Sequence, residues 1–148
     1  RDVLERHGLY DGMVLGMGDK QVAAAAVGRV ADAVACMGMS NPHASHFRRW
    51  ADGFTKASGG RVGVVRGGLS HLWHGELMDR RYIERYRGFA AFQFDPEADL
   101  VLGPEGAWLW RRRGDLARHV AEYFQSRRED GYARSLGAVP VAESAWQS

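Results

Sequence analysis

Large aromatic side chains recur at helical spacing in the segment 42–57. Phe47, Trp50 and Phe54 stand at positions i, i+3 and i+7, which places their rings on one side of a helix. An aromatic stripe of this width is stable in water only when other parts of the chain cover it. The spacing therefore predicts an amphipathic helix over these residues and assigns its aromatic face to the core.

Further helices are predicted on both sides of this segment, each with a start or stop signal of its own. Gly8 ends the first of them, because glycine tolerates the left-handed conformation of a C-terminal cap. Asp19 and Asp115 each precede a run with helical periodicity and are expected as N-caps. Asn41 has the same role before Pro42. The expected helices span residues 2–7, 19–35, 42–57, 76–93 and 115–131.

Strand candidates are few and short. The β-branched segment 59–68 is flanked by glycine pairs, and a second candidate follows at 69–73. Segments 100–102 and 107–110 are separated by Gly103-Pro104-Glu105-Gly106, which predicts a hairpin with a four-residue loop. No repeated strand–helix units are present to build a doubly wound sheet. The expected fold class is therefore α/β or α+β, with a small mixed sheet, about four helices and apolar helix surface that a partner domain would cover.

Length and composition indicate one ordinary globular domain. A chain of 148 residues with 45% hydrophobic and 26% charged residues can bury one core. The longest apolar run, 22–27, is too short for a membrane span, and the first residues carry no signal-peptide pattern. The single cysteine, Cys36, suits a reducing compartment and is expected as a small core residue. We expect a soluble, cytoplasmic protein with one domain over 1–131 and a flexible tail over 132–148.

Basic residues gather in arginine clusters, although the formal net charge is only +2. These clusters leave room for an anionic ligand. They are interleaved with acids rather than arranged in one stripe, so nucleic acid is not an expected partner. One cluster stands on the first turns of the helix 76–93, where it is placed to meet phosphate or carboxylate, with a solvated basic face as the alternative. Its residues are Arg80, Tyr82 and Arg85.

Two histidines three residues apart offer imidazole nitrogens to a divalent metal. His71 and His74 stand beside glycines at the end of the strand candidate 69–73. Side chains alternate along a strand, so one metal ligand is expected rather than two unless the chain turns between them. The alternative is one half-buried hydrogen-bonding histidine and one surface histidine. His43 and His46 have the same spacing on a predicted helix and are expected as solvated residues.

A glycine-rich turn precedes Asp19. Gly16 and Gly18 let the backbone approach a ligand closely, and the carboxylate of Asp19 can accept hydrogen bonds or a proton. An N-cap after a tight turn explains the same residues without any ligand. Spacing alone leaves both interpretations open.

Four pieces of the chain, in a fixed order, carry a family resemblance. They are Gly8-Leu9-Tyr10-Asp11, then Gly16-Met17-Gly18-Asp19, then His71-Leu72-Trp73-His74-Gly75 followed by Arg80-x-Tyr82-x-x-Arg85, and last Tyr123-Phe124-x-x-Arg127-Arg128-Glu129-Asp130. Together they resemble the C-terminal half of bacterial glycosyltransferases with the A-type fold, over residues 2–131.

The resemblance implies a role for each piece. It implies that Gly16 and Gly18 contact the acceptor sugar and that Asp19 is the catalytic carboxylate. It also implies that His71, with His74 as its competitor, completes the coordination of a divalent cation, Mn²⁺ or Mg²⁺. Transfer of a sugar from a nucleotide-sugar donor to a glycan acceptor would then be metal-assisted.

The donor side of such an enzyme is missing from these residues. No Asp-x-Asp motif occurs in the sequence, and no N-terminal βαβ series is present to bind a nucleotide. We therefore expect the chain alone to be inactive and to need an N-terminal half that binds the donor. A homo-oligomer is a further way to cover its apolar faces.

Two other classes of function compete with this one. A small metal-dependent hydrolase or nuclease would use His71, His74 and Asp19 together as ligands. A non-catalytic carbohydrate-binding module would stack sugars on Trp108 and Trp110, whose spacing permits a shared face, although a buried hairpin face is the simpler expectation.

Overall fold

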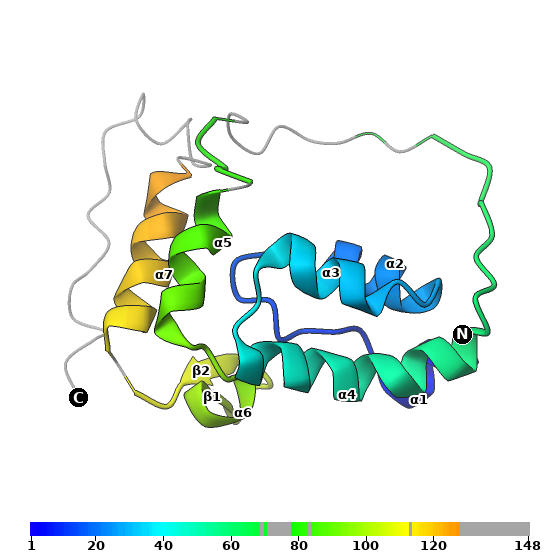
Figure 1. The fold of residues 1–148 in the computed structure, drawn as a ribbon, viewed down its shortest axis with the longest axis horizontal. Coiled ribbons are helices and arrows are strands. Elements are labelled where there is room, and N and C mark those ends of the chain that lie inside the picture. Colours follow the sequence, from blue (N-terminus) through cyan, green and yellow to red (C-terminus); the bar gives the residue numbers. More distant parts are fainter. Residues whose placement is uncertain (69, 71–77, 83, 113, 128–148) are drawn as a thin grey trace.

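A computed structural model gives the fold and describes residues 1–148 except 69, 71–77, 83, 113 and 128–148 (Figure 1). The described residues form helices and one two-stranded antiparallel sheet, so the α+β expectation is confirmed, whereas the expected mixed sheet of an A-type fold stays a prediction. The predicted strand 69–73 lies outside these residues, apart from Ser70, and the predicted tail 132–148 lies wholly outside them. The elements are α1 (Asp2–His7), α2 (Gly18–Ala26), α3 (Val30–Met37), α4 (Asn41–Ser58), α5 (Glu84–Phe89), the 3-10 helix η1 (Ala90–Phe92), α6 (Pro96–Asp99), β1 (Leu100–Leu102), β2 (Trp108–Trp110) and α7 (Asp115–Ser126).

Helix α4 buries much of its aromatic stripe, as the spacing predicts. Phe47 is fully buried and Phe54 nearly so, while Trp50 is half-buried and stacks on Phe54 with 4.7 Å between ring centroids. Helices α1, α2, α3 and α6 all contact α4. Ser40 occupies the N-cap position in place of the expected Asn41, and its hydroxyl donates instead to the carbonyl of Phe94 at 2.8 Å.

The single helix expected over 19–35 is wrong, because the chain forms two helices there. Gly28 adopts a left-handed conformation with φ of 74°, which ends α2 and turns the chain into α3. Met17, also left-handed, is the N-cap of α2, so Asp19 lies inside the first turn and is not the expected cap. Cys36 on α3 is exposed rather than in the core, and its sulfur accepts a hydrogen bond from Lys20.

No strand forms in the segment 59–68, contrary to the prediction. Val64 and Val65 are 93% and 95% exposed, and the segment runs along the outside of the molecule (Figure 1). A β-branched segment becomes a strand only when a partner satisfies its backbone groups, and the described residues supply none here.

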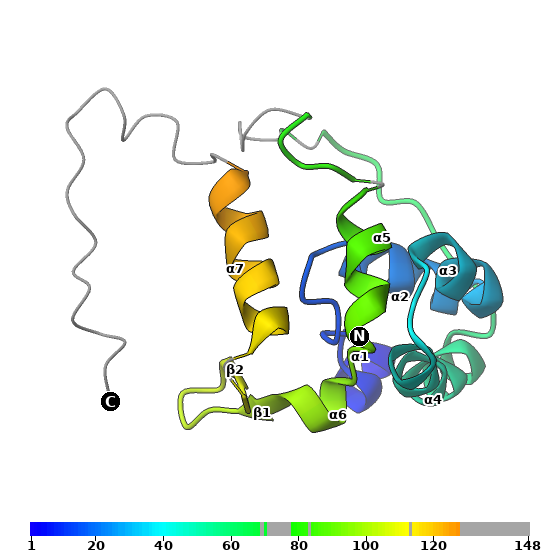
Figure 2. The ribbon, with the colours of Figure 1, turned by 60° about the vertical axis from the view of Figure 1, so that its left-hand side comes forward.

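The remaining elements form a second group beside the first, with α5 and α7 side by side in both views (Figures 1 and 2). The predicted hairpin is confirmed, with Leu100 opposite Trp110 and Leu102 opposite Trp108. Of the helix expected over 76–93, the described residues form α5 from Glu84, whereas Met78 lies in a turn and is 87% exposed. Helix α7 begins at Asp115 with Gly114 as its N-cap, and ends at Ser126 rather than at residue 131.

Among the residues that the structure describes, no helix combines the length and the apolar character needed to cross a membrane.

Replacing Phe47 by Ala should lower the free energy of unfolding by about 3–5 kcal/mol, because the ring is fully buried and its loss leaves a cavity. Phe124 is 44% exposed on α7, so Phe124→Ala is the matched control and should cost less than about 1 kcal/mol. Denaturant titration followed by circular dichroism measures both values. Equal losses in the two variants would contradict the central place of α4 in the core.

Candidate functional site

The turn before Asp19 is a strained loop fixed to the core. Gly16 and Met17 both have left-handed backbone, with φ of 87° and 69°. Leu15 anchors the loop from one side, since its side chain is fully buried. Gly18 is close-packed, because a Cβ atom there would lie 3.2 Å from the carbonyl oxygen of Tyr10. The loop therefore presents its backbone in one fixed shape, as the glycine pattern predicts.

Asp19 lies exposed at the start of α2, at the edge of an open groove of about 970 Å³. The groove runs along α2 and has a largely apolar lining that includes Leu9, Val22 and Val27. The N-terminal end of a helix favours an ionised carboxylate, because the helix dipole and the first N–H groups are positive there. Asp19 thus offers a solvent-accessible carboxylate beside a surface able to hold a ligand.

The basic cluster packs inward instead of forming a solvated face. Arg80 and Arg85 are only 8% and 7% exposed, while Tyr82 is 41% exposed. The guanidinium of Arg80 donates to the hydroxyl of Tyr82 at 2.6 Å. Arg85 donates to the hydroxyl of Tyr123 at 2.7 Å, and that hydroxyl donates in turn to the backbone carbonyl of Arg80 at 3.1 Å.

Arg85 is held by aromatic rings rather than by an acid. Its guanidinium carbon lies 4.9 Å from the ring centroid of Tyr82, 5.4 Å from that of Tyr86 and 5.8 Å from that of Tyr123. Within the part of the chain that the structure describes, it makes no ion pair with a carboxylate. Its charge is therefore balanced there only by ring faces and a hydroxyl dipole.

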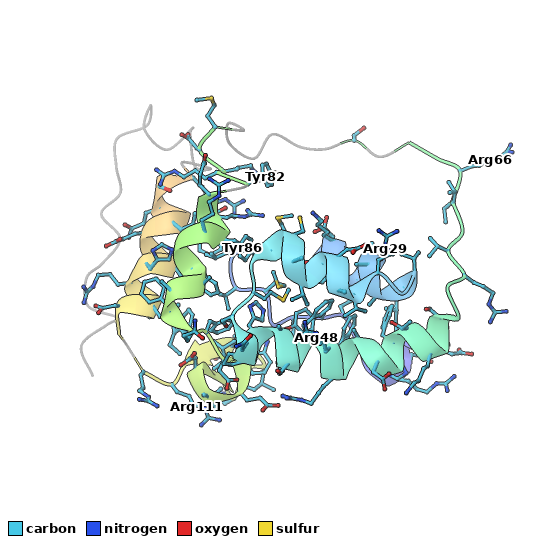
Figure 3. All side chains as sticks on the ribbon, in the orientation of Figure 1. Arg29, Arg48, Arg66, Tyr82, Tyr86 and Arg111 are labelled. Carbon is cyan, nitrogen blue, oxygen red and sulfur yellow. The ribbon has the colours of Figure 1, made fainter. Side chains whose placement is uncertain are left out.

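The glycine-rich loop and the basic cluster meet in space. The hydroxyl of Tyr86 donates to the carbonyl of Gly16, across 70 positions in the sequence. Figure 3 shows Tyr86 pointing from α5 toward the N-terminal helices. A Cβ atom at Gly16 would lie 3.8 Å from Nη1 of Arg85. Burial raises the pKa of Tyr86 above its usual range, and the Asp19 carboxylate contributes in the same direction, so its hydroxyl stays protonated and can donate.

The predicted metal ligands, His71 and His74, lie outside the described residues. In the remainder of the chain, no group of three or more His, Cys, Asp or Glu side chains is arranged to hold a metal ion. The metal site therefore remains a prediction from the sequence.

Sequence reasoning missed a cluster formed by Tyr10, His43 and His46. His43 is 1% exposed, so the expectation of two solvated histidines is wrong. Its ring contacts that of Phe94 edge to face at 5.1 Å, and Nδ1 of His46 lies 3.0 Å from the hydroxyl of Tyr10. The missed signal is the helical spacing itself, because positions 43 and 46 extend the stripe of Phe47 backwards along α4.

Burial controls the protonation of both histidines. It lowers the pKa of His43 to about 4, and it also lowers the pKa of His46. Both rings are therefore neutral at pH 7, where His46 can exchange a hydrogen bond with Tyr10 without carrying a charge.

Comparison of the chain with protein-family models, with curated proteins and with solved structures gave no match in any of the three. The resemblance carried by the four sequence pieces stays a prediction, and the function must be argued from the site.

The buried His43 should make stability depend on pH in the acid range. Its pKa is about 6.5 in the unfolded chain and about 4 in the folded one, so the unfolded state binds more protons between these values. Its contribution is present above pH 6.5 and is lost as the pH falls toward 4, by an amount on the order of 3 kcal/mol. Unfolding free energies measured across this range should fall less steeply in His43→Gln than in the wild type. Phe124→Ala, which removes an exposed ring without a titratable group, should keep the wild-type slope.

Proposed function

We propose that the chain forms the acceptor-side and metal-completing part of a nucleotide-sugar-dependent glycosyltransferase, whose donor pocket comes from residues outside this sequence. The observation that carries the proposal is the meeting of the loop at Gly16 with Tyr86 and Arg85. Gly16 and Arg85 belong to pieces of the resemblance that are far apart in the sequence, and Tyr86 directly follows the piece that ends at Arg85. Tyr123, from the last piece, holds Arg85 in the same place. Convergence of separate motifs is what a shared site requires.

In this proposal Asp19 is the catalytic carboxylate. Its exposure at the edge of the groove along α2 lets an acceptor hydroxyl approach it. As the hydroxyl oxygen bonds to the anomeric carbon of the donor sugar, Asp19 takes the proton and the bond to the nucleoside diphosphate breaks. The rigid backbone at Gly16 and Gly18 positions the acceptor, because neither residue has a side chain to obstruct a sugar.

The positive charge of the cluster favours the anionic donor. Tyr82 is its most exposed member and the one best placed to touch a phosphate, with Arg80 and Arg85 behind it. A buried guanidinium acts more strongly on a nearby anion than one in water does, because the surrounding dielectric constant is low. His71 or His74 would hold the Mn²⁺ or Mg²⁺ that stabilises the departing diphosphate when the metal is bound.

Release of nucleoside diphosphate tests the proposal. The longest natural chain that contains these residues is incubated with Mn²⁺, a panel of nucleotide sugars and glycan acceptors. Asp19→Asn should lower kcat by about 100-fold or more, since it removes the proton acceptor and keeps the shape of the side chain. Asp32→Asn, at an exposed position on α3, is the matched control and should leave kcat unchanged.

A measurement of metal binding could contradict the proposal. If the 148-residue chain binds Mn²⁺ tightly without any nucleotide, and His71→Ala and Asp19→Asn both abolish that binding, the site is a complete metal centre. That outcome would contradict the glycosyltransferase proposal and favour a small metal-dependent hydrolase.

A further inference from the structure

A second concave site, the Trp108 groove, lies between the hairpin and the start of α4. Its volume is about 320 Å³, and it is lined by Asp11, His46, Glu97, Trp108 and Arg111 together with apolar residues of β1. Pockets for small molecules begin at roughly this size, about 300 Å³. The groove is therefore large enough for a ligand of the size of one sugar ring.

Trp108 gives the groove a fixed aromatic wall. The side chain is 46% exposed, and its indole N–H donates to Oδ2 of Asp11 at 2.9 Å. This bond orients the ring and the carboxylate together. Trp110, on the same strand, instead packs toward the core, with its ring 6.3 Å from that of Phe94. The two tryptophans thus do not form one exposed platform, and Trp108 alone faces a ligand.

The polar residues of the groove are held in place and keep further hydrogen-bonding capacity. Arg111 uses Nε to donate to the carbonyl of Leu100 at 2.9 Å, which leaves its two terminal nitrogens for other acceptors. Glu97 accepts from Arg49 at 2.6 Å through one of its two carboxylate oxygens. Donors and acceptors therefore stand side by side, which suits hydroxyl groups, because each hydroxyl both donates and accepts.

The charges of the groove nearly cancel. Asp11 and Glu97 are negative, Arg111 is positive, and Arg49 is paired with Glu97. Burial keeps His46 neutral at pH 7 by lowering its pKa. A phosphate would meet two carboxylates here, so a neutral ligand is favoured over an anionic one.

We infer that the Trp108 groove binds one neutral sugar residue, whose apolar ring face lies on the indole and whose hydroxyls bond to Asp11, Glu97 and Arg111. Asp11 also lines the groove beside Asp19, so the two grooves share a wall. The part of the inference that rests on the proposed function is the ligand's identity as the acceptor glycan, with one sugar at Asp19 and a more distant one at Trp108.

Binding of neutral sugars to the 148-residue chain tests this site without donor or metal. The chain is labelled with ¹⁵N and titrated with N-acetylglucosamine, galactose, glucose and lactose, and the indole N–H signal of Trp108 is assigned with Trp108→Phe. At least one sugar should shift this signal with millimolar affinity. Trp108→Ala should weaken binding at least about tenfold, because it removes the aromatic wall.

Matched variants separate binding from folding. Phe124→Ala removes an aromatic ring of similar exposure, 44%, away from the groove and should keep the affinity. Asp11→Asn keeps an oxygen that can accept from the indole, so it should preserve the fold by circular dichroism and weaken sugar binding several-fold through loss of the charged acceptor.

Two results would overturn the inference. One is a Trp108 signal that no sugar moves up to its solubility limit, and the other is a signal that inorganic phosphate moves more than sugars do. The proposed function can fail separately. Sugar binding that depends on Trp108 without any transferase activity would support the site and contradict the proposed function. Transferase activity with an acceptor KM unchanged in Trp108→Ala would contradict only the identity of the bound sugar as part of the acceptor glycan.

Discussion

Burial of the aromatic face of α4 is the constraint on which the rest of the structure depends. The N-terminal part of the chain is tied to it twice: the indole of Trp50 donates to the carbonyl of His7 at 2.9 Å, and the ring of Tyr10 packs on that of Phe47 at 4.9 Å. The C-terminal part is tied to it through Phe94, which is fully buried against His43. One apolar surface therefore sets the positions of both segments that carry candidate site residues, through His7 at the end of α1 and through Tyr10 and Phe94, which lie outside helices and strands.

One tyrosine hydroxyl connects the two groups of helices, and another connects two helices within the second group. Tyr86 reaches from α5 to the loop at Gly16, and Tyr123 links α7 to Arg85. A tyrosine can make such a connection because its ring contributes apolar contact while its hydroxyl satisfies a buried polar group. Burial raises the pKa of Tyr86, so this donor does not ionise in the physiological range. The guanidinium of Arg85 lies among these rings beside the loop, and no carboxylate of the described residues pairs with it directly.

The sequence predicts the elements whose signals are local. The helix over 42–57 and the hairpin at residues 100–110 depend on spacing and turn residues within one segment, and both are found. The prediction of one helix over 19–35 is wrong because the left-handed Gly28 separates α2 from α3. The position of this break depends on how the two helices pack on α4. The prediction of a strand over 59–68 is wrong because a strand needs a second strand to pair with, and that second strand comes from a distant part of the sequence. The prediction of a solvated His43 is wrong for a similar reason, since Phe94 and the loop at Gly12, both distant in the sequence, cover its ring. The sequence identifies the residues of the glycine-rich loop and of the basic cluster as candidate site residues. It does not predict that the loop and the cluster lie in contact.

The two grooves around Asp11 differ in a way that bears on the proposed chemistry. A glycosyltransferase brings together an anionic donor and an acceptor that is often neutral, and each needs surroundings of matching charge. Arg85 lies beside Gly16 of the glycine-rich loop, whereas acids and bases nearly cancel around Trp108. The ring of Tyr10 packs in the core on Phe47, and its hydroxyl forms a hydrogen bond with His46, which lines the Trp108 groove. If sugars occupied the Trp108 groove, they would bind against a wall that is braced through Tyr10 and α4, so occupancy there would favour the same loop geometry that positions Asp19.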